Sequence, residues 1–483
     1  MSDYFTDASE LARAITMKKI SPKEVVLETI DRIEKLNPYL NAVVSKQYEK
    51  ALEESINRDF RGKPFGGVPI LLKDLGQEEE GELVTSGSPL FKNYRAKQTS
   101  HYVSRLKDMG FIVLGRTNTP EFGFKNISDS RLHGVANLPD DWSRNAGGSS
   151  GGAAAVVSAG IVPIAAASDG GGSIRIPASF NGLIGLKPTR GRIPVGPGSY
   201  RGWQGASVNF AMTKSVRDAK RLLYYLQTCQ MESPFVLPKL SEKNLFKNSN
   251  SPLKIAVLFD SPIGSPLSDD AKKALQKAIA FFNDDKDNVE VLTKQPLDGF
   301  EAMQTYYLMN SVETAAMFDK IGAGMERALN QDDMELMTWA IYQSGKSILA
   351  KTYSKLLNRW DYYSEKMANF HKKYDIILTP TVNQVAPKHG EFNLDDDLKM
   401  RLSHITSASV SEQQDLIWEM FEKSLSWTPF TQQSNLTGQP AISLPIYRNQ
   451  EGLSLGVQLI AAKGREDILL NIAQKWEDEK RFL

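Results

Sequence analysis

The chain has 483 residues, 41% of them hydrophobic and 24% charged, and its formal net charge is +1. A net charge this close to zero gives no electrostatic reason to expect nucleic acid or an anionic membrane as a partner. The only cysteine, Cys229, excludes an intrachain disulfide and a multi-cysteine metal site.

No targeting or membrane segment is predicted. The N-terminus is acidic and lacks the apolar stretch of a secretory signal. The most apolar run, residues 153–167, is broken by Ser158, Gly160 and Pro163, whereas a membrane-spanning helix needs roughly 20 apolar residues. We therefore expect a cytoplasmic protein.

The first half of the chain alternates between predicted helices and strands. Residues 7–10 and 21–24 have the pattern of a capping box, the second with Pro22 at the first helical position. Apolar runs and the segments between them then predict a strand over 67–72 that ends at Lys73, a helix over 100–109, a strand over 111–115, a helix over 151–159 and a strand over 161–167. This alternation is typical of an α/β architecture.

The second half predicts more strands and a long helical stretch. Residues 231–252 are rich in Ser, Asn, Lys and Pro and predict a surface connection. The predicted elements are strands over 254–259, 289–292, 375–380, 441–445 and 453–460, a helix over 268–282, a mostly helical stretch over 300–373 and a closing helix.

Two glycine loops that carry serine lie on either side of the apolar segment. The first, 147–152, contains Ser149 and Ser150, and the second, 170–173, contains Ser173. Backbone N–H groups can approach a ligand closely at glycine, since no Cβ intervenes, and serine hydroxyls can act as nucleophiles or proton carriers. One such loop is more often a turn than a site, but two of them favour one site built from both.

Two other interpretations of the loops fit less well. Neither the phosphate-binding spacing Gly-x-x-x-x-Gly-Lys-Ser/Thr nor the dinucleotide-binding spacing Gly-x-Gly-x-x-Gly is present. Residues 147–151 match the Gly-x-Ser-x-Gly nucleophile elbow, but residues 138–145 include Pro139 and cannot form the central strand that must precede it. None of the five histidines, one of which an elbow serine would need as base, lies in a conspicuous motif.

Lys73 offers another base, at the end of an apolar predicted strand. Burial would lower its pKa, and a neutral amine at pH 7 needs a depression of roughly 3 units from about 10.4. The alternative is a surface lysine paired with Asp74, which the local sequence alone favours.

Several motifs together resemble those of the amidase signature family. They are, in order, Lys73 and residues 147–152, 169–177 and 182–189. Further segments that look like family landmarks are 67–69, 115–122, 215–218, 374–381 and 438–443. The resemblance covers nearly the whole chain and is weakest over residues 230–370.

The resemblance implies an α/β fold with one large twisted mixed β-sheet covered by helices on both faces, and a mostly helical insertion in the second half. Residues 1–483 would form a single amidase domain. Its parts would be an N-terminal helical region (1–66), the signature core with the catalytic triad (67–230), a variable α/β and helical substrate-side region (231–373), and C-terminal strands and a helix that complete the sheet (374–483).

By position, the resemblance implies a Ser–cis-Ser–Lys triad. Ser173 would be the nucleophile, Ser149 the bridging serine on a cis peptide, and Lys73 the base. Ser149 would carry a proton between Ser173 and neutral Lys73 and return it to the leaving amine. The expected activity is hydrolysis of a small or linear carboxamide through an acyl-enzyme, without a cofactor or metal ion.

The second loop would supply the oxyanion hole through its backbone N–H groups. The expected donors are Gly170, Gly171, Gly172 and Ser173.

Three residues around the loops are expected to support the site. Asp169 and Arg175 flank the second loop and are expected to form a structural ion pair, and Ser150 is expected to hydrogen-bond within the site. Gly170 departs from the family, in which this position is commonly Thr or Ile, and the missing side chain is expected to loosen the loop or enlarge the pocket.

The C-terminal part bears on the substrate. Where the glutaminase subunit of the tRNA-dependent amidotransferase needs an acidic residue, this chain has Thr428. This argues against glutamine, and residues 427–438 are more similar to stand-alone bacterial amidases, including the nylon-oligomer cyclic-dimer hydrolase type. Two alternatives remain, the glutaminase subunit or else a non-catalytic small-molecule-binding protein.

Variable segments would supply the contacts to a small-molecule amide. These segments are 122–127, 200–204, 306–310 and 427–432, with Trp203, Tyr306 and Trp427 as candidate substrate-binding residues. Aromatic side chains at such positions line a core as often as a pocket. The resemblance also leaves a homodimer possible.

Overall fold

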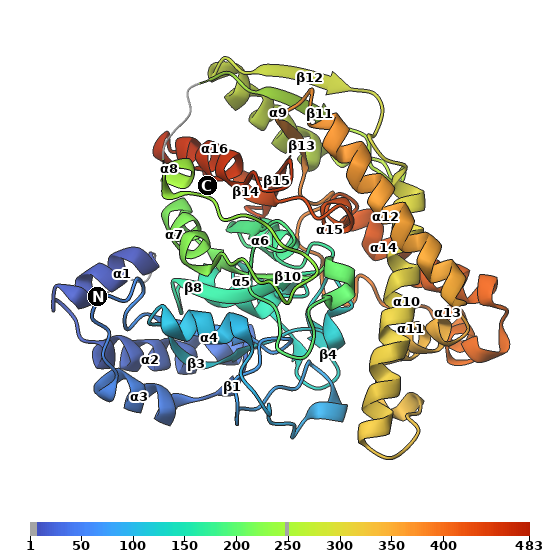
Figure 1. Cartoon of the computed structure of the whole chain (residues 1–483), viewed down its shortest axis with the longest axis horizontal. Coiled ribbons are helices and arrows are strands. Elements are labelled where there is room, and N and C mark those ends of the chain that lie inside the picture. Colours follow the sequence, from blue (N-terminus) through green and yellow to red (C-terminus); the bar gives the residue numbers. More distant parts are fainter. Residues whose placement is uncertain (1–6, 247–250) are drawn as a thin grey trace.

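The computed structural model describes residues 7–246 and 251–483. An eleven-stranded sheet runs through it, with the strand order β1-β3-β2-β8-β10-β9-β14-β15-β13-β11-β12 (Figure 1). Parallel and antiparallel pairs are mixed, since β2 pairs with β3 and β8 in parallel whereas β14 and β15 are antiparallel. Helices pack against this sheet, and the large mixed α/β fold confirms the predicted fold class.

The sheet takes strands from both ends of the chain. Two small hairpins lie outside it, β4 (Asp129–Ser130) with β5 (Gly134–Val135) and β6 (Asn137–Leu138) with β7 (Asp141–Asn145). The strands of the large sheet are β1 (Val43–Lys46), β2 (Pro69–Lys73), β3 (Ile112–Thr117), β8 (Ile164–Asp169), β9 (Ile184–Lys187), β10 (Val208–Thr213), β11 (Lys254–Leu258), β12 (Asn288–Leu292), β13 (Ile376–Pro380), β14 (Ala441–Arg448) and β15 (Ser454–Ala461).

The helices include a long helical stretch in the second half, as predicted. They are α1 (Ala8–Thr16), α2 (Pro22–Leu40), α3 (Tyr48–Asn57), α4 (His101–Asp108), α5 (Gly151–Ser158), α6 (Arg175–Phe180), α7 (Val216–Leu226), α8 (Glu242–Phe246), α9 (Asp269–Asp284), α10 (Gly299–Gly324), α11 (Leu336–Lys346), α12 (Ala350–Phe370), α13 (Asp396–Ser403), α14 (Val410–Trp427), α15 (Gln432–Leu436) and α16 (Glu466–Asp478).

The two predicted capping boxes have different outcomes. At α2 the box is complete, because Ser21 and Glu24 exchange side-chain-to-backbone hydrogen bonds. At α1 Asp7 accepts from the Glu10 N–H, but the reciprocal bond is not made. The Glu10 carboxylate instead accepts from Arg217 at 2.7 Å, so a tertiary contact replaces the local one.

Three strands of the large sheet were not predicted from the sequence. β1, β9 and β10 are short, and polar residues interrupt their apolar pattern, such as Asn209 in β10. β10 nevertheless lies between β8 and β9 in the middle of the sheet. Its position depends on pairing with distant segments rather than on its own pattern.

Parallel pairing brings the ends of two strands together. In β2 and β8, Leu71 lies opposite Ala165, and both strands run in the same direction. The residues at their C-terminal ends, Lys73 and Asp169, therefore lie at the same edge of the sheet. In open α/β sheets, ligands bind outside the carboxyl ends of the strands, so this edge is where a site is expected.

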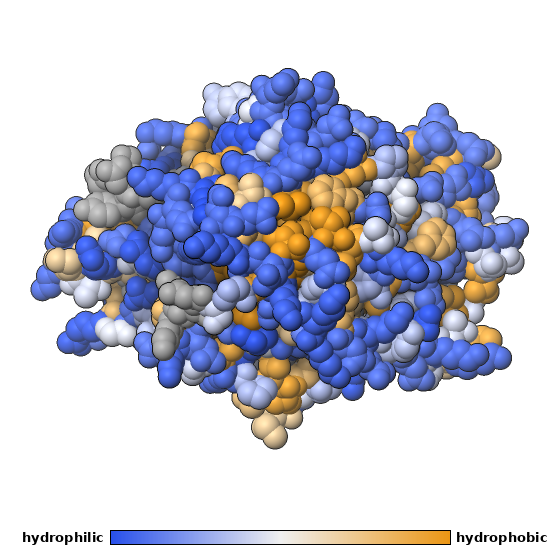
Figure 2. All heavy atoms as spheres, turned by 90° about the horizontal axis from the view of Figure 1, so that it is seen from above, coloured by the Kyte–Doolittle hydropathy of each residue, from blue (hydrophilic) through white to orange (hydrophobic). Residues whose placement is uncertain are grey.

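Apolar side chains form a main core around the sheet and a second cluster among α10 to α14. Hydrophilic residues cover most of the face in Figure 2, around a smaller group of hydrophobic residues near its middle. Among residues 7–246 and 251–483, no helix has both the length and the apolar character needed to cross a membrane.

Candidate active site

Lys73 lies fully buried at the end of β2. Its ammonium nitrogen donates to the hydroxyl of Ser149 at 2.7 Å and to that of Ser168 at 3.0 Å. Asp74 points elsewhere and accepts from the Thr85 N–H at 2.8 Å. The interpretation of Lys73 as a surface lysine paired with Asp74 is therefore wrong.

Burial also changes the acidity of this lysine. Desolvation lowers the pKa of Lys73 to about 7, against the opposing effect of the Asp169 charge. A group that would be a cation on the surface is therefore neutral in a large fraction of molecules near pH 7.

Two residues that the sequence did not single out hold Lys73 in place. The Gln77 side chain accepts from the Lys73 N–H at 2.7 Å and donates to the Ala167 carbonyl of β8 at 3.1 Å. Buried Arg116 donates to the backbone carbonyls of Lys73 and Gln77, at 3.2 Å and 2.7 Å. Ser168 was also missed, although a polar residue near the end of an apolar strand is a signal that could have identified it.

Ser149 follows a cis peptide bond, Gly148–Ser149, which the family resemblance implied. Only glycine fits before it, because a Cβ at Gly148 would lie 2.6 Å from the backbone nitrogen of Ile127. Ser150 caps α5 and donates to the Ser168 carbonyl at 3.1 Å. Ser150 thus ties the first loop to β8, as a supporting residue would.

Asp169 and Arg175 form the expected ion pair, with an N–O distance of 2.8 Å and both side chains fully buried. Burial alone would raise the pKa of Asp169, but the charge and hydrogen bonds of Arg175 hold it well below its ordinary value. Arg175 also donates to Ser434 and Asn435 of α15, at 2.8 Å and 2.6 Å. The pair therefore connects the second loop to the C-terminal part of the chain.

The Gly172 N–H is not free for an oxyanion. It donates to the Asp169 carboxylate at 2.8 Å. The expectation that Gly172 is an oxyanion-hole donor is therefore not met, because the ion-paired carboxylate already uses this group. The N–H groups of Gly170, Gly171 and Ser173 remain as candidates.

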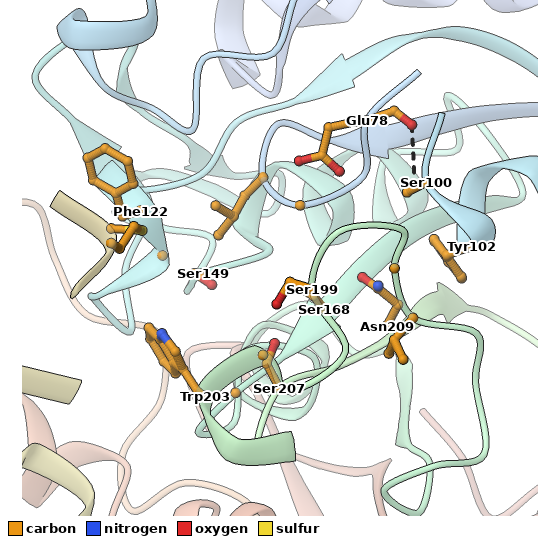
Figure 3. A pocket seen from close by; sticks show the side chains of 18 of the residues that line it. Glu78, Ser100, Tyr102, Phe122, Ser149, Ser168, Ser199, Trp203, Ser207 and Asn209 are labelled. Atoms are coloured by element: carbon orange, nitrogen blue, oxygen red, sulfur yellow. Dashed lines mark hydrogen bonds between the residues drawn. The ribbon is translucent and has the colours of Figure 1, made fainter. Parts of the chain in front are cut away.

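Ser173 and Ser149 line the same cavity, which has a volume of about 540 Å³. Figure 3 views this cavity, with Phe122 and Trp203 on the side nearer Ser149 and Asn209 on the other side. Ser173 also lines a second cavity of about 60 Å³, which neither Ser149 nor Ser168 reaches. Among the described residues, no hydrogen bond joins the Ser173 hydroxyl to another group, so the structure joins Lys73 to Ser149 but leaves Ser173 unattached.

The three candidate aromatic residues have different positions. Trp203 lines the large cavity, and Tyr306 lines both cavities and donates to the Gly170 carbonyl at 3.2 Å. Trp427 lines neither. Its indole N–H donates to the Val385 carbonyl at 2.8 Å and its ring packs on Phe392, so Trp427 as a substrate contact is wrong and it is a packing residue.

Trp203 fills the space that the missing side chain of Gly170 leaves. A Cβ at Gly170 would lie 3.2 Å from two ring atoms of Trp203. The same ring stacks on Phe124, with centroids 5.9 Å apart. Gly170 therefore neither loosens the loop nor enlarges the pocket, because an aromatic wall packs directly on it.

We expect Gly170→Val to lower kcat/KM for amide hydrolysis by about 5- to 150-fold, because overpacking of a close contact costs about 1–3 kcal/mol. Trp203→Ala in the same chain should restore part of the loss, since it removes the ring that a Cβ would meet. Kinetics of the two single variants and the double variant measure this coupling.

Gly202→Ala is the matched control for that cycle. Gly202 lines the same cavity, but its Cβ would meet only the Cβ of Ser207, at 3.9 Å. This variant should keep wild-type kinetics. A double variant no more active than Gly170→Val would show that Trp203 is not the obstacle.

A second buried lysine shows that a lowered pKa alone does not mark the site. Burial, aided by the charge of Arg175, lowers the pKa of Lys187 to about 7. Its ammonium nitrogen donates to the Pro188 carbonyl at 2.9 Å, and it lines neither cavity at Ser173. The contact with Ser149 distinguishes Lys73.

A family model described as Amidase matches residues 24–470. A lipoamidase of Enterococcus faecalis is 38% identical, over 98% of this chain and 63% of that protein, so the chain spans less than two thirds of its length. A 6-aminohexanoate-cyclic-dimer hydrolase of Paenarthrobacter ureafaciens is 33% identical over 98% of this chain and 95% of that protein. The solved structure of a 6-aminohexanoate cyclic dimer hydrolase complexed with substrate matches with a TM-score of 0.89 and 31% identity, covering 99% of this chain and 97% of that chain.

Proposed function

This chain belongs to the amidase signature family, and from that premise we propose that it hydrolyses carboxamides with Ser173 as nucleophile, Ser149 as proton relay and Lys73 as base. Membership makes it an amidase that acts on amide bonds. The observation that carries the finer proposal is the 2.7 Å hydrogen bond between the Lys73 amine and the Ser149 hydroxyl, in a buried site where the lysine pKa is about 7.

In the first half-reaction, neutral Lys73 accepts the proton of Ser149 while Ser149 accepts that of Ser173. The Ser173 oxygen bonds to the amide carbon, and the resulting oxyanion accepts hydrogen bonds from the N–H groups of Gly170, Gly171 and Ser173. Ser149 then protonates the amide nitrogen, the C–N bond breaks, and an amine leaves from acyl-Ser173.

In the second half-reaction, water replaces the amine. The relay takes a proton from the water, whose oxygen bonds to the acyl carbon, and the proton passes to Ser173 as the ester bond breaks. The product is a carboxylic acid. These steps use only side chains, backbone N–H groups and water.

The two cavities give the substrate a direction. Ser149 must reach the leaving nitrogen to protonate it, and Ser149 lines only the large cavity. The amine part therefore lies in the large cavity, and the acyl part points from Ser173 toward the small one. The large cavity has mixed polar and aromatic walls, which suits a small-molecule amine.

The alternative of a glutaminase subunit has less support. One of the relatives, the glutaminase-type chain of a glutamyl-tRNA(Gln) amidotransferase from Bdellovibrio bacteriovorus, is 30% identical to this chain. However, the small cavity, where a glutamine acyl group would lie, contains Thr428. Thr428 accepts a hydrogen bond from Asn126 at 2.9 Å and cannot form an ion pair with an α-amino group.

We also propose that residues 1–483 act as one catalytic unit. The sheet combines strands from residue 43 to residue 461, and Arg175 joins the signature core to α15. These contacts support a single domain.

Labelling with an alkyl fluorophosphonate tests the proposal. We expect one adduct, on Ser173, because an activated serine displaces fluoride from phosphorus. Peptide mass spectrometry locates it. Ser207→Ala, at another serine of the same cavity, should be labelled like the wild type. No adduct, or an adduct that persists in Ser173→Ala, would contradict the assignment of the nucleophile.

A further inference from the structure

Three cavities follow one another along the segment of residues 122–127. Phe122, Gly123 and Phe124 line the large cavity. Gly123 to Asn126 line the small cavity next to Ser173. Lys125, Asn126 and Ile127 line a third cavity of about 400 Å³, called the side cavity here. Consecutive residues thus contact consecutive cavities, and the small cavity lies between the other two.

The boundary between the small cavity and the side cavity is formed by Asn126 and α14. The Asn126 side-chain amide donates to the Ser424 carbonyl and to the Thr428 hydroxyl, both at 2.9 Å. Asn126 and Ser424 line both cavities. One hydrogen-bonded side chain on a loop therefore separates the two spaces.

The side cavity has a largely apolar wall that no step of the reaction uses. Lys125 lies on another wall, where its ammonium pairs with Asp129 at 2.6 Å and with Glu335 at 2.8 Å. These pairs fix the loop that carries Asn126. The apolar lining residues are Ile127, Leu336, Met337, Phe392, Leu394 and Met420.

The small cavity is too short for a long acyl group. About 60 Å³ holds roughly four to six water-sized groups, at about 10–15 Å³ each. An unbranched acyl chain with more heavy atoms than this must continue beyond the small cavity. The next available space in that direction is the side cavity.

We propose that the acyl chain of the substrate runs from Ser173 through the small cavity and past Asn126 into the side cavity. The substrate class is amides of long, unbranched, mainly aliphatic acids, and the Asn126–Ser424 contact is the passage that sets acyl length. This inference rests on the proposed acyl-enzyme at Ser173. Asn126 turns aside when a long chain binds, which exchanges two hydrogen bonds for burial of the chain.

Hydrolysis of a series of p-nitroanilides with acyl chains of two to ten carbons tests the passage. For the full-length wild type we expect kcat/KM to rise about fourfold for each methylene buried beyond the small cavity. Ser424→Trp fills the boundary and should remove this rise. It should leave the acetyl substrate within about twofold of the wild type.

Two further variants complete the test. Leu394→Trp shortens the side cavity without touching the boundary, so it should lower only the longest substrates, and it serves if Ser424→Trp does not fold. Ser199→Trp makes the same serine-to-tryptophan change in the large cavity. Because all substrates share one amine, it should change every acyl length by the same factor.

The inference fails while the proposed function stands if the anilides are hydrolysed but kcat/KM does not rise with acyl length. It also fails if Ser424→Trp and Leu394→Trp affect acetyl and decanoyl substrates equally, since the side cavity then takes no acyl group. If no anilide is hydrolysed and no acyl-Ser173 forms, the proposed function itself is wrong, and the inference with it.

Discussion

Replacing Ser173 with alanine is expected to lower kcat for amide hydrolysis on the order of a million-fold, as loss of the nucleophile does in other serine hydrolases. The physical reason is that no other atom on the loop can form the acyl bond. Among the described residues no hydrogen bond joins the Ser173 hydroxyl to another group, so its removal should leave the melting temperature almost unchanged. Steady-state turnover of an anilide and thermal unfolding measure the two effects.

Ser207→Ala is the control for this change. Ser207 lines the large cavity but lies outside the proposed relay, so its loss should change kcat by no more than about twofold. If Ser173→Ala keeps more than a small fraction of the activity, the nucleophile is another group. If Ser173→Ala lowers activity only because the protein unfolds, the melting temperature will reveal it.

Lys73→Met is expected to lower kcat/KM by about 100- to 10,000-fold, the usual contribution of a general base. Methionine keeps a long side chain in the buried site and removes the amine that contacts Ser149. In the wild type, kcat/KM should rise tenfold per pH unit below pH 7 and become constant above it. The sign follows from burial, which lowers the pKa of Lys73 to about 7: below this pH the lysine is protonated and cannot accept a proton.

Lys187→Met is the matched control for the pH profile. Burial lowers the pKa of Lys187 to about 7 as well, but this lysine contacts the Pro188 carbonyl rather than a serine. The inflection near pH 7 should therefore remain in Lys187→Met and be absent from Lys73→Met. The reverse result would assign the titrating group to Lys187 and remove Lys73 from the relay.

Short motifs made the centre of the candidate site predictable. Ser149 and Ser173 lie in glycine loops whose residue types can be recognised without a structure, and β2 and β8 are apolar runs. The Asp169–Arg175 pair was predicted for the same reason, since both residues flank the same loop. Neither depends on knowing which distant segment packs nearby.

Other parts of the site were not predictable, because they depend on contacts between distant segments. Trp203 and Trp427 are the same residue type in variable segments, but only Trp203 lies in the cavity, packed on Gly170. Gly172 was predicted as an oxyanion donor, but the side chain of Asp169 accepts its N–H. Asn126 gained its place at a cavity boundary from α14, whose contacting residue lies 298 positions away in the chain.

The sequence by itself determined the family, the fold class and the order of Lys73, Ser149 and Ser173, because these follow from residue types and local spacing. Only the tertiary structure decided the state of Lys73, whose local sequence favoured a charged surface residue. The β2–β8 pairing places its amine in a buried site, in contact with Ser149. Desolvation acts through space, so the pKa of Lys73 depends on segments that its neighbours in the sequence do not reveal.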